Sequence, residues 1–135
     1  MALFTRASKL LRGAADEAMS RHGVRIGQNI VLEVLWESDG LTPGEIASRL
    51  HLTTPTIVNT ATRMEAAGLL TRRRDETDAR LVRLYLTDRA RDAREAVQQE
   101  RQDLERRATA ELTPDERRHL HSALTKIIHA LEKSP

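Results

Sequence analysis

The sequence contains no cysteine, and this absence removes several kinds of chemistry at once. A disulfide framework, a thiolate metal site and a thiol redox switch all need cysteine side chains. Aromatic side chains are scarce too, with only Phe4, Trp36 and Tyr85 among 135 residues. No apolar run approaches the roughly 18 residues that a membrane-spanning helix needs, and the N-terminal segment lacks the apolar stretch of a signal peptide. We therefore expect a cytoplasmic protein that is neither exported nor inserted in a membrane.

Motifs of the common enzyme classes are also missing. The sequence has no glycine-rich phosphate loop, no HExxH zinc motif and no GxSxG nucleophile elbow. Its histidines do not form a ligand pattern, because His119 and His121 stand two residues apart and face different sides of a helix. We expect no enzyme activity, no metal site and no cofactor.

The residues that are present are typical of one folded, charge-rich domain. Hydrophobic residues make up 39% of the sequence and charged residues 31%, and 135 residues suffice for a single core. Basic residues outnumber acidic ones by 22 to 20, and the whole excess lies between residues 53 and 87, where six arginines accompany four acids. Arginine suits phosphate and base recognition, although a run of arginines taken alone is generally a solvated loop.

Two helices separated by a tight turn are predicted in the middle of the chain. Thr42, Pro43 and Glu45 have the spacing of a capping box at the start of the first helix. Thr54 and Pro55 indicate the N-cap and the first position of the second. A short helix, a turn and a second helix outline a helix-turn-helix, although an ordinary helical hairpin has the same pattern.

The second of these helices has an apolar face and a polar face. Ile57, Ala61 and Met64 follow helical spacing on the inner side, and Gly68 is the expected stop. The outward positions are Thr56, Asn59, Thr60 and Arg63. Arg63 has an alternative role, which is to pair with Glu65 or Asp75 and support the fold.

After this helix the apolar period changes from helical to alternating. Val82, Leu84 and Leu86 point to one side and Arg83 and Tyr85 to the other, as in a half-buried strand. The preceding segment GLLTRRR can supply an antiparallel partner, and DETDA supplies a turn-prone tip. A two-stranded hairpin is marginal alone, so it must pack on the helices. The sequence therefore predicts a mainly α fold with a small β-hairpin wing, a winged helix-turn-helix.

Helices are also predicted over residues 2–20, 27–37, 88–108 and 114–133. The second of these is expected to bury Ile30, Val31, Val34 and Leu35, and the third has a thin stripe of Ala93, Val97 and Leu104 behind a cap at Thr87. The last helix repeats the capping pattern with Thr113, Pro114 and Glu116, and carries the continuous apolar face Leu120, Leu124, Ile127, Ile128 and Leu131. We expect the terminal helices to bury these stripes against each other and against a second chain.

Three segments, LTPGEIASRL, TIVNTATRMEAAGLLTR and DARLVRLYLT, together resemble the MarR family of transcription regulators. The resemblance implies one MarR-type domain over residues 1–135, with a winged helix-turn-helix core at 27–87 and helical dimerisation regions at 1–26 and 88–135. It also implies a homodimer that binds a pseudo-palindromic double-stranded DNA operator, usually as a repressor. A small-molecule effector can release such a dimer from the operator.

The resemblance assigns roles to individual residues as well. A recognition helix at 54–67 would enter the major groove and a wing at 69–86 the minor groove, where Arg80 would be the probe and Asp78 would brace the wing by pairing with Arg72. The candidate DNA-binding residues are Thr54, Thr56, Asn59, Thr60, Arg63, Arg72, Arg73, Arg74 and Arg80. His22, Arg25 and Trp36 are candidates for an effector pocket. The alternative function is a winged-helix module for protein contact, which would leave the recognition face neutral or apolar; the positive segment argues against it.

Overall fold

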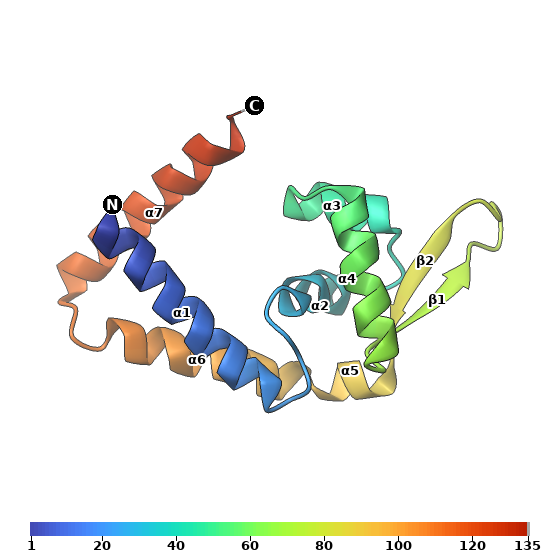
Figure 1. The fold of residues 1–135 in the computed structure, drawn as a ribbon, viewed down its shortest axis with the longest axis horizontal. Helices are drawn as coiled ribbons and strands as arrows, with labels where there is room; N and C mark the ends of the chain where they lie inside the picture. Colours follow the sequence, from blue (N-terminus) through green and yellow to red (C-terminus); the bar gives the residue numbers. More distant parts are fainter. Residues whose placement is uncertain (135) are drawn as a thin grey trace. The chain divides into compact units, whose positions relative to one another are not determined.

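The computed structural model describes residues 1–134 (Figure 1). In chain order its elements are α1 (Ala2–Ser20), α2 (Gln28–Glu37), α3 (Pro43–Leu50), α4 (Thr54–Ala66), β1 (Leu70–Arg74), β2 (Val82–Leu86), α5 (Asp88–Asp92), α6 (Arg94–Thr109) and α7 (Pro114–Glu132). Helices with one antiparallel hairpin confirm the predicted fold class. The chain divides into two compact units, one from Met1 to Arg101 and one that begins at Gln102.

α3 begins at the predicted threonine cap. Thr42 has an extended backbone (φ −76°, ψ 156°), and its hydroxyl oxygen accepts the backbone N–H of Glu45. The return bond of the capping box differs from the expected one, because the Glu45 carboxylate accepts the Thr42 hydroxyl at 3.1 Å instead of the Thr42 backbone N–H. α3 ends at Leu50, and the capping residue after it, His51, has a left-handed backbone (φ 54°) that turns the chain toward α4.

α4 begins one residue earlier than predicted, so the assignment of its cap was wrong. The cap is Thr53, whose hydroxyl oxygen accepts the backbone N–H of Thr56 at 3.3 Å, and Thr54 is already helical. Pro55 therefore occupies the second helical position, where its missing N–H leaves the third residue as the donor to the cap. Gly68 ends the helix with φ +78°, as expected.

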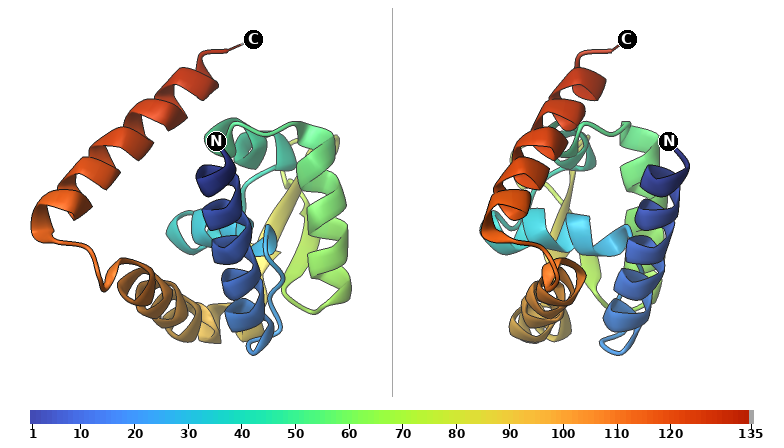
Figure 2. Two further views of the ribbon diagram at one scale, coloured as in Figure 1. Left: turned by 60° about the vertical axis from the view of Figure 1, so that its left-hand side comes forward. Right: turned by 90° about the vertical axis from the view of Figure 1, so that its left-hand side faces the viewer.

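The apolar face of α4 lies in the core of the first unit. Ile57, Ala61 and Met64 are each 1% exposed or less, which confirms the predicted inner face. The left view of Figure 2 shows α4 at the periphery of this unit, with α3 joined to its upper end. Other buried members of the core come from α1, α2, α3, the hairpin and α5: Met19, Leu32, Leu35, Ile46, Leu69, Leu70, Leu84 and Ala90.

The buried stripe of α2 is rotated from the predicted one. Ile30 is 38% exposed and Val34 only half-buried, whereas Leu32 and Trp36 are buried. The spacing of the stripe is still helical, and its members are Gln28, Val31, Leu32, Leu35 and Trp36. The rotation brings the largest side chain of the helix into the core, where the Trp36 indole N–H donates to the carbonyl of Ala90 at 3.0 Å.

The hairpin has the predicted antiparallel pairing. Leu70 lies opposite Leu86 and Arg74 opposite Val82, and Leu84 and Leu86 are buried while the intervening side chains are not. The outer edge of β2 is also paired, because Leu41 forms an antiparallel bridge with Leu84. In Figure 1 the hairpin lies at the edge of the first unit, with its connecting loop directed away from α2 and α5.

The predicted helix from Thr87 to Ala108 is interrupted. Thr87 caps α5 by accepting the backbone N–H of Ala90, as expected, but regular helix stops at Ala93 and resumes as α6. The interruption is one residue long, because the backbone N–H of Ala93 still donates to the carbonyl of Arg89 and that of Val97 donates to the carbonyl of Ala93.

The second unit contains the C-terminal part of α6 and the whole of α7. The capping box predicted for α7 is fully formed: the Thr113 hydroxyl accepts the Glu116 N–H, and the Glu116 carboxylate accepts the Thr113 N–H. Within the described residues α7 buries no side chain. Its five predicted apolar-face residues are 38% to 68% exposed. No helix in residues 1–134 is long and apolar enough to cross a membrane.

Candidate nucleic-acid interface

The outer face of α4 is polar and open to solvent. Thr56, Asn59 and Arg63 are exposed and Thr60 is half-exposed, on the side opposite the buried stripe. The Thr56 hydroxyl lies 2.8 Å from that of the cap Thr53, so part of its hydrogen-bonding capacity is used within the helix start. These positions carry hydroxyl, amide and guanidinium groups, which are the groups that hydrogen-bond base edges.

Arg63 does not support the fold by either ion pair considered from the sequence. Glu65 binds Arg72 and Asp75 binds Arg83, and no ion pair to Arg63 is found in the described part of the chain. An exposed arginine without a carboxylate partner keeps its charge available for an external anion.

Arg72 connects the first strand of the wing to α4. Its Nε donates to the Glu65 carboxylate at 2.7 Å, and its Nη2 donates to the Thr62 hydroxyl at 2.7 Å. The predicted pairing of Arg72 with Asp78 was therefore wrong. Glu65 is the nearer partner because α4 packs directly against β1, whereas Asp78 lies beyond the far end of the strands.

Asp78 pairs with Arg80 instead. Both carboxylate oxygens of Asp78 accept from the Arg80 guanidinium, at 3.1 and 3.2 Å, and one also accepts the Arg80 backbone N–H. These bonds, with the side-chain bond the strongest, lower the pKa of Asp78 below its ordinary value. The Arg80 side chain is nevertheless 90% exposed, so it is oriented by a neighbour and still faces solvent.

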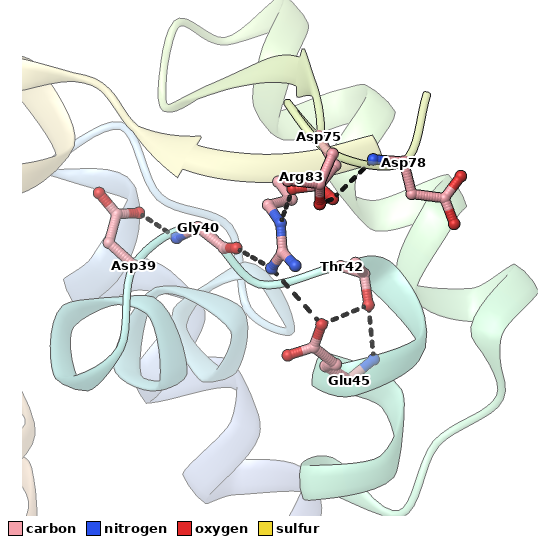
Figure 3. Close-up of polar contacts among 8 residues, drawn as sticks. Asp39, Gly40, Thr42, Glu45, Asp75, Asp78 and Arg83 are labelled. Atoms are coloured by element: carbon pink, nitrogen blue, oxygen red, sulfur yellow. Dashed lines mark hydrogen bonds and ion pairs between the residues drawn. The ribbon is translucent and has the colours of Figure 1, made fainter. Parts of the chain in front are cut away.

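Arg83 lies at the centre of a polar group at the stem of the wing (Figure 3). Its Nε donates to Asp75 at 3.1 Å, its Nη1 donates to the carbonyl oxygen of Gly40 at 2.9 Å, and the same Nη1 lies 3.6 Å from Glu45. The Arg83 guanidinium and, next, the Thr77 hydroxyl lower the pKa of Asp75, so that carboxylate is ionised at neutral pH.

The two remaining arginines of the first strand, Arg73 and Arg74, are neighbours and therefore lie on opposite faces of the strand. Arg73 places its guanidinium over the ring of Tyr85, 4.7 Å from the centroid, which is a cation–π contact. Arg74 donates to the carbonyl of Ala79 at 3.5 Å across the hairpin loop. Both arginines are exposed. Neither has a carboxylate partner in the described residues, so both present positive charge to solvent.

The three candidate effector residues do not come together. His22 lies 3.2 Å from the carboxylate of Glu100, and the Trp36 indole is a core group with its N–H already bonded. Only Arg25 lines a hollow of the first unit, about 350 Å³ in volume. The other residues that line it are Asp16, Ile26, Gly27, Gln28, Thr60 and Arg63.

Sequence reasoning missed the contribution of Arg83, Asp75, Glu45 and Gly40. The alternating pattern had placed Arg83 on the polar side of its strand, so that position was known and its partners were not. Gly40 carried a sequence signal only as a glycine between two predicted helices. In the structure its φ is +76°, and an added Cβ would lie 2.7 Å from the Tyr85 ring, so the position needs glycine.

A helix-turn-helix followed by an arginine-bearing hairpin defines a winged helix-turn-helix protein. Comparison with known proteins narrows this class. The MarR family model matches residues 26–82. TtmR, an HTH-type transcriptional regulator of Methylorubrum extorquens, is 42% identical over 73 residues, which are 54% of this chain and 37% of TtmR. MgrA of Staphylococcus aureus, also an HTH-type transcriptional regulator, is 26% identical over 98% of this chain and 88% of its own length.

Solved structures of MarR-family proteins are similar to this chain in fold. The S. aureus MepR–DNA complex has a TM-score of 0.84, 27% identity and 96% coverage of both chains. A MarR mutant from E. coli complexed with operator DNA has a TM-score of 0.82 at 24% identity, with 93% of this chain and 91% of that chain covered. Residues 26–82 of this chain are a winged helix-turn-helix segment of the MarR family of transcriptional regulators, and the chain as a whole has the fold of the MarR-family structures. This family consists of DNA-binding regulators and not of enzymes, as the sequence predicted.

Proposed function

We propose that this protein binds operator DNA as a homodimer, with α4 in the major groove and the β1–β2 wing in the minor groove. The observation that carries the proposal is the shared exposure of the α4 polar face and of Arg80, whose side chain is 90% exposed beyond the hairpin stem. The similar MepR structure is a complex with DNA, which supports the proposal of DNA binding.

The α4 face offers the groups for direct reading of bases. The Asn59 amide can bond adenine N6 and N7, and the Arg63 guanidinium can bond guanine O6 and N7. Thr54, Thr56 and Thr60 can add bonds to bases or to the backbone. Each good bidentate pair contributes about 1–3 kcal/mol of discrimination against the wrong base.

The wing offers charge where the minor groove is most negative. A narrow A·T-rich minor groove attracts an inserted arginine, and Arg80 is the arginine beside the hairpin loop. Asp78 holds the Arg80 guanidinium in orientation. Arg73 and Arg74 contact phosphates, which position the protein without reading sequence. Arg72 acts through its bonds to α4, so its part in DNA binding is to hold the wing in place.

A second copy of the chain is the partner we propose for the exposed apolar face of α7. Five large apolar side chains on one face of a helix need a cover, and a two-fold dimer supplies an identical one. Two α4 helices related by a two-fold axis then require half-sites about 10 bp apart, centre to centre.

In this proposal the protein represses transcription by occupying its operator in the cytoplasm. A small effector then releases the protein from the DNA. The hollow lined by Arg25, Thr60 and Arg63 is the site we assign to such a ligand, because a molecule bound there contacts α4 itself. Effector binding therefore remains linked to one of the three residues named from the sequence, Arg25.

The test begins with selection of bound duplexes from a random pool, followed by titration at two salt concentrations. We expect affinity to fall steeply with salt, because neutralised phosphates release counterions. The Arg80→Ala variant should bind the selected operator about tenfold more weakly, the loss of one good arginine contact, and melt within a few degrees of wild type. The matched control is Arg91→Ala, an exposed arginine outside the proposed interface.

Unchanged operator binding by a folded Arg80→Ala variant would reject the wing assignment. The alternative function, a protein-contact module, predicts neither duplex binding nor a salt dependence, so the titration of wild type alone separates the two functions.

A further inference from the structure

Arg83 contacts three segments that are far apart in the sequence. Besides Asp75 in its own hairpin, its guanidinium meets the carbonyl of Gly40 in the α2–α3 connection and the carboxylate of Glu45 in the first turn of α3. The Arg83 side chain is 29% exposed and the Asp75 side chain 16%, against 90% for Arg80. We call Arg83, Asp75, Glu45 and the Gly40 carbonyl the stem clasp (Figure 3).

The stem clasp compensates an unfavourable cross-strand pair. Arg73 and Arg83 lie directly opposite each other in the hairpin register, and like charges in directly opposed positions destabilise a strand pair. Arg83 turns to Asp75 and Glu45, while Arg73 turns onto the Tyr85 ring. The two carboxylates therefore allow an arginine in the stem without repulsion between the strands.

The wing is held to both helices of the helix-turn-helix. On one face of the hairpin, Arg72 binds Glu65 and Thr62 of α4. On the opposite face, Arg83 binds the start of α3 and the connection before it, which also bonds the outer edge of β2 through Leu41 and Leu84. A hairpin with one anchor can rotate about it, whereas anchors on both faces fix its direction.

We propose that Arg83 is a positioning residue for DNA recognition: the stem clasp sets the direction of the wing relative to α4, and Arg83 itself does not contact DNA. The proposal rests on the proposed function, because it assumes that the wing and α4 bind the same duplex. If both elements must reach their grooves at once, a wing that swings loses contacts even though every contacting side chain is still present.

The stem clasp and simple electrostatics predict opposite changes in DNA affinity when the charge of Asp75 is removed. Asp75→Asn removes one negative charge beside the proposed interface, and a protein that acted only as a positive surface would then bind DNA more tightly. The clasp predicts weaker binding, because the Arg83 guanidinium loses its strongest partner. Glu76→Gln is the matched control, since it makes the same charge change in the exposed loop, one residue away from Asp75.

The experiment measures operator affinity at several salt concentrations for wild type, Asp75→Asn, Glu76→Gln, Arg83→Gln and the double variant Asp75→Asn/Arg83→Gln. We expect about a tenfold loss for Asp75→Asn and a similar loss for Arg83→Gln, the size of one charge-assisted contact. The double variant should lose no more than either single variant, because both remove the same interaction. Glu76→Gln should bind as tightly as wild type or more tightly.

The salt dependence separates positioning from direct contact. A phosphate contact made by Arg83 would lower the slope of log affinity against log salt by about 0.9 in Arg83→Gln and leave it unchanged in Asp75→Asn. Positioning predicts equal slopes for the two variants. Footprints should also lose protection in the minor groove while the major-groove protection from α4 remains.

Tighter or unchanged binding by Asp75→Asn, or a slope lowered only in Arg83→Gln, would overturn the clasp. If Asp75→Asn does not fold, the double variant carries the test with the same expected loss, because it removes the Arg83 charge together with that of its Asp75 partner. Wild-type binding with a salt slope keeps the proposed function standing whatever the clasp variants do. Wild type that binds no duplex rejects the proposed function itself.

Discussion

α4 and α7 are both amphipathic helices that begin at a threonine cap, yet their apolar faces have different environments. In α4, Ile57, Ala61 and Met64 are buried within the same compact unit. In α7, Leu124 is 39% exposed and Leu131 68% exposed. The apolar face of α4 is therefore covered within its own unit, whereas the apolar face of α7 is left exposed within its unit. Substitutions on the apolar face of α4 should therefore change folding stability, and substitutions on the apolar face of α7 should change assembly.

Truncating the buried face of α4 should have the largest effect. Met64 is 0% exposed, so Met64→Ala leaves a cavity and should lower the free energy of unfolding by about 2–5 kcal/mol. Chemical denaturation at one fixed protein concentration measures the change. Met64→Leu, which keeps the volume, should cost less than about 1.5 kcal/mol. Equal stability of Met64→Ala and wild type would mean that this helix is not packed as described.

A charge on the apolar face of α7 should break assembly instead. Leu124→Glu is expected to raise the dimer dissociation constant about a hundredfold, or about 2.7 kcal/mol, because a carboxylate would be buried in the proposed interface. Sedimentation over a range of concentrations measures it.

Ser122→Glu is the control for this change, because residue 122 lies on the opposite side of α7 and is exposed. It should leave the dimer intact. If Ser122→Glu dissociates the protein and Leu124→Glu does not, the second copy covers a different face.

The caps permit a finer comparison. Thr53→Ala should destabilise α4 by about 1 kcal/mol, because it removes the acceptor of the Thr56 N–H. Thr54→Ala should cost much less, since Thr54 is already the first helical residue. Thermal unfolding of both variants measures the difference. A larger loss for Thr54→Ala would restore the cap position expected from the sequence.

The smallest expected effect is a difference between the N-termini of α4 and α7 in their response to acid. The Glu116 carboxylate accepts the Thr113 backbone N–H in α7, and this bond, followed by that of the Thr113 hydroxyl, lowers its pKa. A carboxylate whose pKa is lower in the folded state contributes stability above its unfolded pKa, about 4.3, and loses it as pH falls through the folded value.

The start of α7 should therefore fray below about pH 4, while α4, whose cap pairs two threonines, should not respond through its cap. NMR titration of the Thr113 amide and the Glu116 carboxyl measures this. Glu116→Gln should abolish the pH response of the Thr113 amide; a response that persists would assign it to another group.

Local features of the fold were predictable because neighbouring residues set them. Threonine and proline at helix starts, helical spacing in α4 and α7, and alternation in β2 each predicted the correct type of element. Errors arose where local signals were equivalent. Thr53 and Thr54 are both competent caps, and the α2 stripe could rotate by one position because apolar residues occur on several sides of that helix.

The ion pairs of the candidate site were less predictable. Residues 72 to 80 offer several arginines and acids within a short distance in sequence, and the pattern contains nothing that selects a pairing. Packing selected it: β1 lies on α4 and gives Arg72 to Glu65, while the α2–α3 connection lies on β2 and gives Arg83 a carbonyl 43 residues away.

Caps, periodicity and turn residues act over a few neighbours, so the elements, their order, the polar face of α4 and the family resemblance could all be inferred from the sequence. Which charges hold the wing and which remain available depends on the packing of distant segments. Coulombic and hydrogen-bond partners are chosen by distances of a few ångströms, and those distances exist only once α3, α4 and the hairpin have packed together.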